Sequence, residues 1–223
     1  WASQSGLPRT IGHRKGVEAV SRTVRRAGES GIEVLTLFAF SKENWNRPKV
    51  EVRELMSLLQ RYIRSDLDEL VENGVRVGVV GGRDDLDPHL TKLIDEAEAR
   101  TAGNDRMRLM LAFNYGGRDE IVRAARRVIA AVQAGELAPE ALDEEAFGAH
   151  LDTAGLPDPD LVIRTSGEIR ISNFLLWQSA YAEYAFPGVL WPDFSEAEFD
   201  GMLADFARRQ RRFGAVPLAA VPR

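Results

Sequence analysis

Short apolar runs alternate along this chain with amphipathic segments of helical length, and this alternation restricts the fold more than any other feature. The runs at 32–40, 75–80, 108–113 and 161–164 are typical of buried strands. The remaining segments are predicted by their apolar spacing to be helices at 12–29, 48–70, 87–101, 119–134, 143–151, 173–185 and 195–212, with a last short strand at 189–191. Strands that alternate with long helices indicate one α/β domain with a mainly parallel sheet.

Length and composition limit the number of domains and the kinds of site and partner that this chain can have. A chain of 223 residues suits a single domain over 1–223, with a tail that we expect to be flexible from 215 to 223. The absence of cysteine excludes disulfides, thiolate metal sites and cysteine nucleophiles, and it suits a reducing cytoplasm. The net charge of −5 gives no reason to expect nucleic acid as a partner. Because the three histidines lack ligand spacing, we expect no zinc site.

Polar loops follow each predicted strand, and these loops are where a ligand is expected. They span 41–48, 81–84, 114–118 and 165–172. In an open α/β sheet, ligands bind beyond the carboxyl ends of the parallel strands. The four loops should therefore meet at one edge of the sheet and form the functional site.

The last of these loops, "RTSGEIRIS", is rich in strong hydrogen-bond donors. Arg164 leaves the predicted strand, and Arg170 and Ser172 precede the predicted helix. An arginine fork matches phosphate oxygens, and a helix start favours an anion. The segment therefore predicts a phosphate or diphosphate site. The alternative is that the arginines pair with local carboxylates such as Glu168 or Asp160.

A second group of cations lies near the start of the first predicted helix. Arg9, His13, Arg14 and Lys15 stand there, and Arg47 comes from the loop after the first strand. Cations at a helix start oppose the helix dipole unless an anion sits among them. The group predicts a second anion site, and a plain solvated basic face is an equally weighted alternative.

Three other features allow two interpretations each. Glu183 falls on an apolar line of the predicted helix, where it would contact Mg²⁺ or lie at a solvated edge. Trp45 is either a packing anchor or a wall for an apolar ligand. The paired glycines of "NYGGRDE" form a tight turn or cradle a phosphate, and the turn is favoured.

Taken together, the stretches "FAFSKENWNRP", "NYGGRDEIV", "DLVIRTSGEIRISNFLLWQSAYAEYAF" and "LWPDF" resemble the cis-prenyltransferases, in particular the bacterial undecaprenyl diphosphate synthases, from Trp1 to about Gly214. The resemblance implies a parallel sheet of about six strands flanked by helices, a hydrophobic tunnel within each subunit, and a homodimer. It implies repeated addition of isopentenyl diphosphate to an allylic diphosphate, usually farnesyl diphosphate, with cis double bonds and with Mg²⁺ as cofactor. A transient contact with the membrane that receives the lipid fits the same activity.

The resemblance also implies roles for single residues. Arg164, Arg170 and Ser172 match the residues that bind isopentenyl diphosphate. Glu183 matches a residue that reaches the metal site of the partner subunit. Asn44, or the diphosphate itself, is the candidate proton acceptor. The other expected substrate-binding residues match the allylic diphosphate site and the loop that closes over it: Trp1, Arg9, His13, Phe40, Ser41, Glu43, Trp45 and Arg47. Ala39 matches a residue of the tunnel wall, and residues 212–214 match an end that approaches the neighbouring site.

The chain departs from the family pattern in two places. The family begins with a strand and an Asp-Gly-Asn-x-Arg-Trp-Ala loop, of which only Trp1 and Ala2 are present. We therefore expect that the numbering begins inside the natural protein, with the catalytic aspartate and the first strand upstream. Ile169 stands where some relatives have His or Gln. A shorter-chain synthase and a non-catalytic partner subunit are the alternatives to a long-chain synthase.

Overall fold

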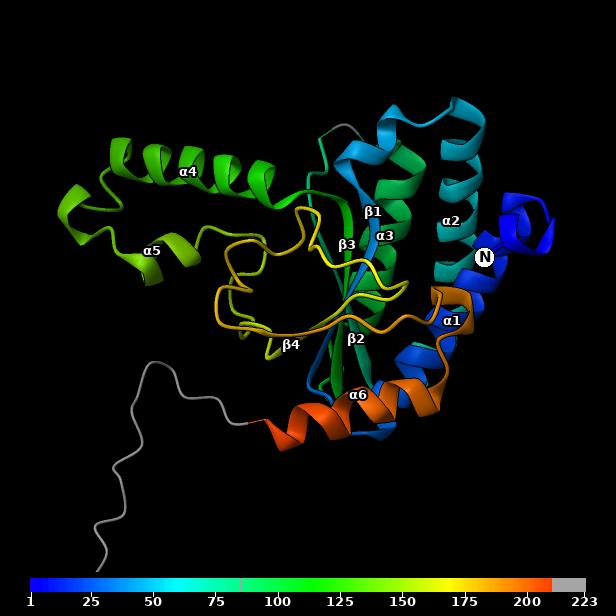
Figure 1. Cartoon of the computed structure of the whole chain (residues 1–223). Coiled ribbons are helices and arrows are strands. Elements are labelled where there is room, and N and C mark those ends of the chain that lie inside the picture. Colours follow the sequence, from blue (N-terminus) through cyan, green and yellow to red (C-terminus); the bar gives the residue numbers. More distant parts are fainter. Residues whose placement is uncertain (85, 210–223) are drawn as a thin grey trace, which may run out of the picture.

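The fold is α/β, as the alternation of strands and helices predicted (Figure 1). The computed structural model describes residues 1–84 and 86–209. The longer helices are α1 (Arg9–Glu29), α2 (Lys49–Glu72), α3 (Pro88–Thr101), α4 (Gly117–Gln133) and α6 (Glu196–Arg208). The strands are β1 (Val34–Ser41), β2 (Val75–Val80), β3 (Met107–Tyr115), β4 (Leu161–Ile163) and β5 (Glu183–Ala185). Short helices complete the order: η1 (Ser3–Ser5), η2 (Lys42–Asn46), η3 (Pro139–Ala141), α5 (Glu144–Gly148) and η4 (Trp191–Asp193).

All strand pairing is parallel, but it is divided between two sheets. The larger sheet has the order β1-β3-β2, with Leu35 opposite Leu109 and Val77 opposite Leu109 from the other side. The smaller sheet pairs β4 with β5. The described residues thus contain five strands in sheets of three and two, where about six strands in one sheet were expected.

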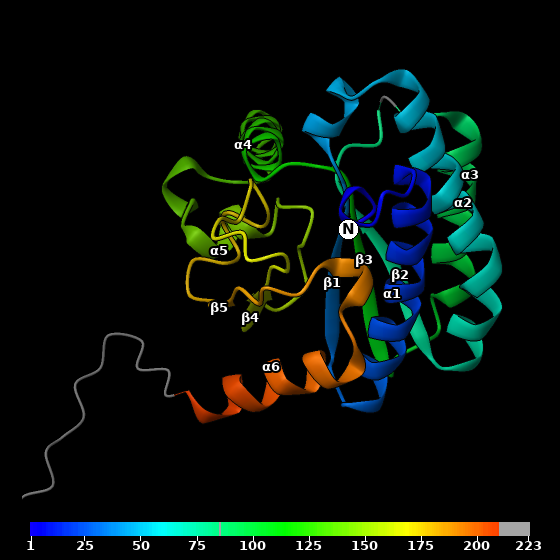
Figure 2. The ribbon, with the colours of Figure 1, turned by 45° about the vertical axis from the view of Figure 1, so that its right-hand side comes forward.

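Two apolar cores lie on the two faces of the larger sheet. Helices α1, α2 and α3 lie on one side of it, and α4, α5, β4 and β5 lie on the other (Figure 2). The first core joins α1–α3 to the strands through fully buried side chains such as Ile94, Met107 and Leu109. The second is smaller and contains Val80, Tyr115 and Leu175. Within the described ranges, no helix combines the length and the apolar character needed to cross a membrane.

The prediction of a helix at 173–185 is wrong. The segment consists of turns followed by strand β5, because Ser172, Asn173 and Leu175 adopt φ angles of 48°, 66° and 45°, which no right-handed helix contains. Its end then pairs with β4, from Leu161 opposite Glu183. Long-range pairing has overridden a helical apolar spacing.

The predicted strand at 189–191 is also absent. The 3₁₀ helix η4 begins at Trp191, with Pro192 in its first turn, where a missing N–H costs nothing. Helix α6 begins within one residue of its predicted start and ends at Arg208. The predicted flexible tail at 215–223 lies outside the described residues.

Gly81, at the carboxyl end of β2, is the glycine whose replacement should cost the most. Its φ is +131°, and a Cβ atom there would lie 1.9 Å from the carbonyl oxygen of Phe113. Gly81→Ala should therefore lower the free energy of unfolding by at least about 2 kcal/mol, measured by urea denaturation. Gly28→Ala in α1, where a Cβ meets open space, should be neutral or stabilising by up to about 1 kcal/mol. Equal effects at the two positions would contradict this account.

Candidate active site

Three loops at the carboxyl edge of the larger sheet are tied together by Asn114, at the end of β3. Its Oδ1 accepts a hydrogen bond of 2.7 Å from Trp45 Nε1, and its Nδ2 donates to the carbonyl oxygen of Gly82 at 2.9 Å. Asn114 has a φ of 47°, a conformation that asparagine adopts more readily than most residues. The loops after β1, β2 and β3 therefore meet, as the topology required.

The fourth loop places Arg164 beside Ser172. Arg164 directly follows β4, and its Nη1 donates to Ser172 Oγ at 2.7 Å. Arg170 instead forms an ion pair with Glu168, and both side chains are largely exposed. The structure thus brings together two of the three predicted residues, and for Arg170 it shows the local pairing that was the alternative.

The backbone of this loop is unusual. Four of the five non-glycine residues with positive φ in the described ranges lie between Ser166 and Leu175. Such conformations cost free energy and concentrate at functional sites. Turns, and not the expected helix, directly follow Ser172, so the N–H groups of a helix start are not available to an anion there. Any anion held here would depend on Arg164, Ser172 and the strained loop itself.

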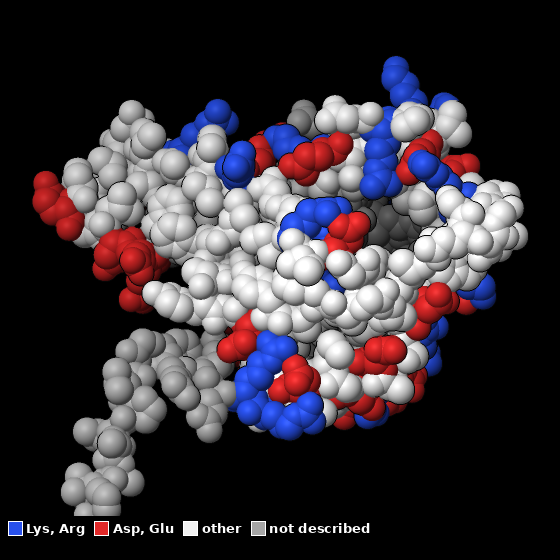
Figure 3. Space-filling view, in the orientation of Figure 1, with Lys and Arg blue, Asp and Glu red and all other residues white. Residues whose placement is uncertain are grey.

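The second cation group converges on one carboxylate. Arg47 Nη1 lies 2.9 Å from Glu51 Oε1, and Arg9 Nη1 lies 3.4 Å from Glu51 Oε2. The Glu51 side chain is only 14% exposed, whereas that of Arg9 is 75% exposed. Glu51 supplies the negative charge that the cations at the start of α1 require, so two guanidinium groups are held close together. In the view of Figure 3 the surface has a hollow, and basic and acidic side chains lie along part of its rim.

His13 and Trp1 lie near the same helix start. His13 Nδ1 is buried and has no hydrogen-bond partner in the described part of the chain. Trp1 Nε1 donates to Asp193 Oδ1 at 2.8 Å, which fixes Trp1 beside η4. A buried nitrogen without a partner is costly, so His13 has an unsatisfied polar atom near this helix start, and Trp1 is held in place.

Helix η2 and its N-cap residue Ser41 hold Ser41, Glu43 and Asn44 in a fixed arrangement. Asn44 Oδ1 accepts from the Ser41 N–H at 3.1 Å, and the Ser41 side chain accepts from the Asn44 backbone, which makes a capping box. Burial alone would raise the pKa of Glu43, but its own backbone N–H, the Asn173 amide and the Ser41 hydroxyl outweigh burial and lower that pKa. Glu43 is therefore held as a carboxylate, and Asn44 shapes the loop.

Phe40 and Trp45 form the apolar part of this loop. Phe40 is 2% exposed and stacks on Phe113, with 5.4 Å between ring centroids. Trp45 meets Phe40 edge to face at 5.0 Å and is 40% exposed. With its hydrogen bond to Asn114, Trp45 is a packing anchor that still presents part of its ring to solvent.

The environment of Glu183 differs from the expected one. Glu183 opens strand β5, and its Oε2 accepts from Arg209 Nη1 at 3.1 Å. Among the described residues, no three acidic or histidine side chains gather as a metal-ligand set. Mg²⁺ is commonly held by one or two carboxylates together with substrate phosphates. Glu183 offers one carboxylate of this kind, but here it is paired with Arg209, so its role as a Mg²⁺ ligand stays a prediction.

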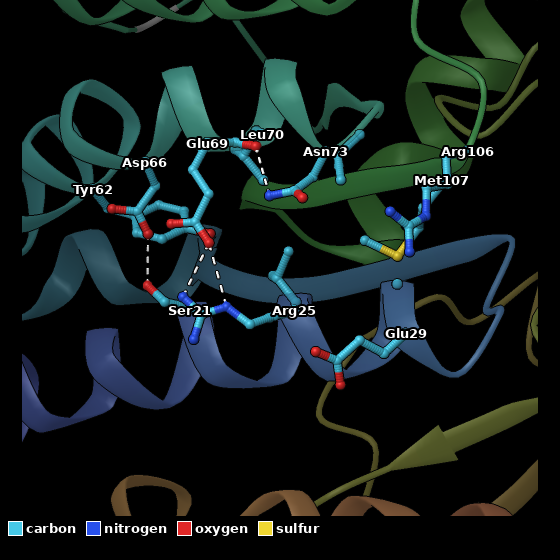
Figure 4. Close-up of a pocket in the computed structure, with 13 residues that line it drawn as sticks. Ser21, Arg25, Glu29, Tyr62, Asp66, Glu69, Leu70, Asn73, Arg106 and Met107 are labelled. Atoms are coloured by element: carbon cyan, nitrogen blue, oxygen red, sulfur yellow. Dashed lines mark hydrogen bonds and ion pairs between the residues drawn. The ribbon is translucent and has the colours of Figure 1, made fainter.

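A cavity of about 290 Å³ between α1 and α2 lies away from the candidate site. It is at the amino end of the strands, next to Val75 and Met107. Ser21 Oγ donates to Asp66 Oδ2 at 2.6 Å across it, and Arg25 pairs with Glu69 at 3.0 Å (Figure 4). This lining is partly charged, so the cavity is not the expected hydrophobic tunnel, which stays a prediction.

A buried network of hydrogen bonds and ion pairs around Glu120 was not predicted from the sequence. Glu120 is fully buried and accepts hydrogen bonds from Tyr115 Oη at 2.6 Å, from the Asp152 N–H at 2.9 Å and from Gln178 Nε2 at 3.1 Å. Asp152 in turn binds Arg123 through two hydrogen bonds of 2.7 and 2.6 Å. Glu120 lies one helical turn into α4, where the sequence gives no sign that it is buried.

The network should make stability depend on acidic pH. Burial alone would raise the pKa of Asp152, but Arg123 and Arg127 outweigh burial and lower that pKa. The stabilisation is therefore present above the unfolded pKa of about 3.9 and is lost as the pH falls through the folded pKa. Urea midpoints should separate the wild type from Asp152→Asn at pH 6, and the separation should shrink toward pH 3. A constant separation would contradict this assignment.

The sequence model described as "Putative undecaprenyl diphosphate synthase" matches residues 1–214. This chain belongs to that family of prenyltransferases. An isoprenyl transferase from Agrobacterium fabrum is 54% identical over 216 residues, which are 97% of this chain and 87% of the relative. One from Geobacter sulfurreducens is 50% identical over 214 residues, which are 96% of this chain and 87% of the relative. The resemblance carried by the sequence motifs is confirmed.

Two solved structures are similar over most of this prenyltransferase. Lavandulyl diphosphate synthase from Lavandula x intermedia, in complex with dimethylallyl diphosphate, matches with a TM-score of 0.92 and 40% identity over 96% of this chain and 92% of that one. A probable undecaprenyl diphosphate synthase from Campylobacter jejuni matches with a TM-score of 0.80 and 37% identity over 90% and 92% of the two chains. This chain therefore shares the fold of these two synthases.

Proposed function

We propose that this prenyltransferase elongates a cis-prenyl chain by condensing isopentenyl diphosphate units onto farnesyl diphosphate, giving undecaprenyl or another long-chain diphosphate as a cell-wall lipid carrier precursor. The observation that carries the proposal is the presence of two separate cationic groups, Arg164 with Ser172 and Arg9 with Arg47. Arg164 directly follows β4, and Arg47 follows η2, the short helix after β1. Two diphosphates require two such groups.

The proposed chemistry divides between the two groups. Arg9 and Arg47 exchange Glu51 for the oxygens of the allylic diphosphate and stabilise the charge that develops as its C–O bond breaks. Arg164 and Ser172 hold isopentenyl diphosphate so that its alkene forms the new C–C bond with the allylic carbon. A proton then leaves the new chain for Asn44 or for the departing diphosphate. Glu183 would hold a Mg²⁺ ion at the site of the partner subunit, and that ion would supply positive charge to neutralise the diphosphate.

Product length distinguishes this proposal from a short-chain alternative. The similarity to lavandulyl diphosphate synthase favours a short product as the second candidate. The test incubates the expressed protein with labelled isopentenyl diphosphate, Mg²⁺ and either farnesyl or dimethylallyl diphosphate, and sizes the products by chromatography. A ladder that ends at a long chain supports the first proposal, and a single short product supports the second. A folded protein that includes the expected aspartate loop and makes no product with either starter would indicate a non-catalytic partner subunit and contradict both.

We also propose a homodimer that uses α4. This helix projects away from the larger sheet (Figure 1) and carries Val122 and Ile129, which are 50% and 57% exposed and lie two turns apart on one face. Val122→Asp combined with Ile129→Asp should give a monomer in sedimentation velocity at micromolar concentration, because two charges cannot be buried unpaired. Val50→Asp on α2, also at an exposed valine, should leave the dimer intact. A dimer in the double variant would contradict the use of α4.

The proposed location is the cytoplasm, with transient contact at the membrane that takes up the product. This follows from the cysteine-free composition and the long apolar product of the proposed reaction. Flotation with vesicles, with and without prior turnover, tests the contact. Binding that depends on turnover would support delivery of the product to the bilayer.

A further inference from the structure

Asn173 connects three parts of the candidate site, although no sequence motif singled it out. Its carbonyl oxygen accepts from the Gly117 N–H at 2.7 Å, and its Oδ1 accepts from the Arg118 N–H at 2.9 Å. Its Nδ2 donates to Glu43 Oε1 at 2.8 Å. One asparagine therefore joins the start of α4, helix η2 and the loop that carries Ser172.

The local backbone is shaped around this residue. A Cβ atom at Gly116 would lie 2.7 Å from Asn173 Nδ2, and one at Gly117 would lie 3.1 Å from the Asn173 carbonyl oxygen. The φ of Asn173 is 66°, a left-handed conformation that asparagine tolerates better than most residues. The paired glycines thus admit Asn173, and the first N–H groups of α4 bind it. The phosphate-cradle interpretation of these glycines is therefore not supported.

The two ends of this connection are both candidate functional groups. Glu43 lies beside Asn44 in η2, which carries the proposed proton acceptor. Ser172 is the neighbour of Asn173 and accepts from Arg164. The Glu43–Asn173 hydrogen bond is a direct side-chain link between η2 and the Ser172 loop, so it fixes the distance between the two halves of the site.

We infer that Asn173 is a positioning residue, which sets η2 with Asn44 against the Arg164–Ser172 pair through its hydrogen bond to Glu43. This inference rests on the proposed function. Loss of the link leaves the diphosphate-binding groups in place but lets η2 move relative to them. The consequence is a lower kcat with little change in KM, because orientation is lost and affinity is kept.

Reversing the hydrogen bond gives a sharp test. Asn173→Asp keeps an acceptor for the Arg118 N–H but places a carboxylate against Glu43. Adding Glu43→Gln restores a donor–acceptor pair with the direction reversed, and Glu43→Gln alone completes a double-mutant cycle. We expect kcat for the Asn173→Asp variant to fall by about ten- to hundredfold with KM within about threefold, and the double variant to recover at least about tenfold. No recovery in the double variant would overturn the inference.

A readout without substrate separates this inference from the proposed function. Hydrogen exchange of residues 41–47 should become faster in the Asn173→Asp variant and return toward the wild-type rate in the double variant. Exchange of residues 117–121 should stay slow in both. If these rates behave as expected but the wild type makes no prenyl product, the proposed function fails and the link stands. If exchange in 41–47 is unchanged in the Asn173→Asp variant, the link itself is refuted.

Discussion

Replacing Arg164 by alanine is expected to raise the KM for isopentenyl diphosphate by about ten- to hundredfold, because hydrogen bonds to charged groups contribute about 1.5–3 kcal/mol each. Arg164 directly follows β4, and its Nη1 already donates to Ser172 Oγ at 2.7 Å, so its guanidinium group is oriented before a ligand arrives. Initial rates at saturating allylic diphosphate measure the effect. Arg164→Lys should recover only part of it, since an ammonium group cannot make two parallel hydrogen bonds.

Two other arginines serve as comparisons for Arg164. Arg170→Ala should have a smaller effect, because Arg170 pairs with Glu168 and must leave that carboxylate to reach a ligand. Arg64→Ala, at an exposed position on α2, should change neither KM. An unchanged KM for isopentenyl diphosphate in Arg164→Ala would remove Arg164 from the proposed site. A rise confined to the KM for the allylic substrate would assign Arg164 to the allylic diphosphate site instead.

Replacing Glu120 by alanine should lower the free energy of unfolding by about 3–5 kcal/mol, the range measured when a buried charged network is broken. Glu120 is 0% exposed, and without it the Tyr115 hydroxyl, the Asp152 N–H and the Gln178 amide lose an acceptor inside the protein. Burial raises the pKa of Tyr115 well above its usual value, and the Glu120 charge adds to this, so the phenol stays a donor. Urea denaturation measures the loss.

Two matched variants separate the network from a general loss of charge. Glu120→Gln keeps the size and one acceptor oxygen, so it should cost less than Glu120→Ala. Glu136→Ala removes an exposed glutamate after α4 and should change stability by no more than about 0.5 kcal/mol. If Glu120→Ala were as mild as Glu136→Ala, the buried network would contribute nothing to the fold.

The sequence alone predicted much of the larger sheet and its helices. Strand β2 has its predicted bounds, 75–80, and α3 starts and ends within one residue of its prediction. Buried apolar residues recur along both elements, such as Val75 and Val77 in β2 and Leu90 and Ile94 in α3, so the apolar period of the sequence marks the face that packs. The motifs identified the family because long stretches occur in the family's order, a signal that does not depend on contacts.

Only the tertiary structure decided what residues 172–185 do. Their apolar spacing suits a helix, yet pairing with β4 and left-handed backbone at Ser172 and Asn173 make turns and a strand. The sharing of Glu51 by Arg9 and Arg47, the burial of Glu120 and the contacts of Asn173 are likewise absent from any local pattern. These arrangements depend on contacts between residues that are far apart in the chain, such as Arg9 with Glu51 and Asn173 with Glu43. Apolar periodicity reports only which face of an element is apolar. Partners across the fold are chosen by packing and by the need to satisfy buried polar groups.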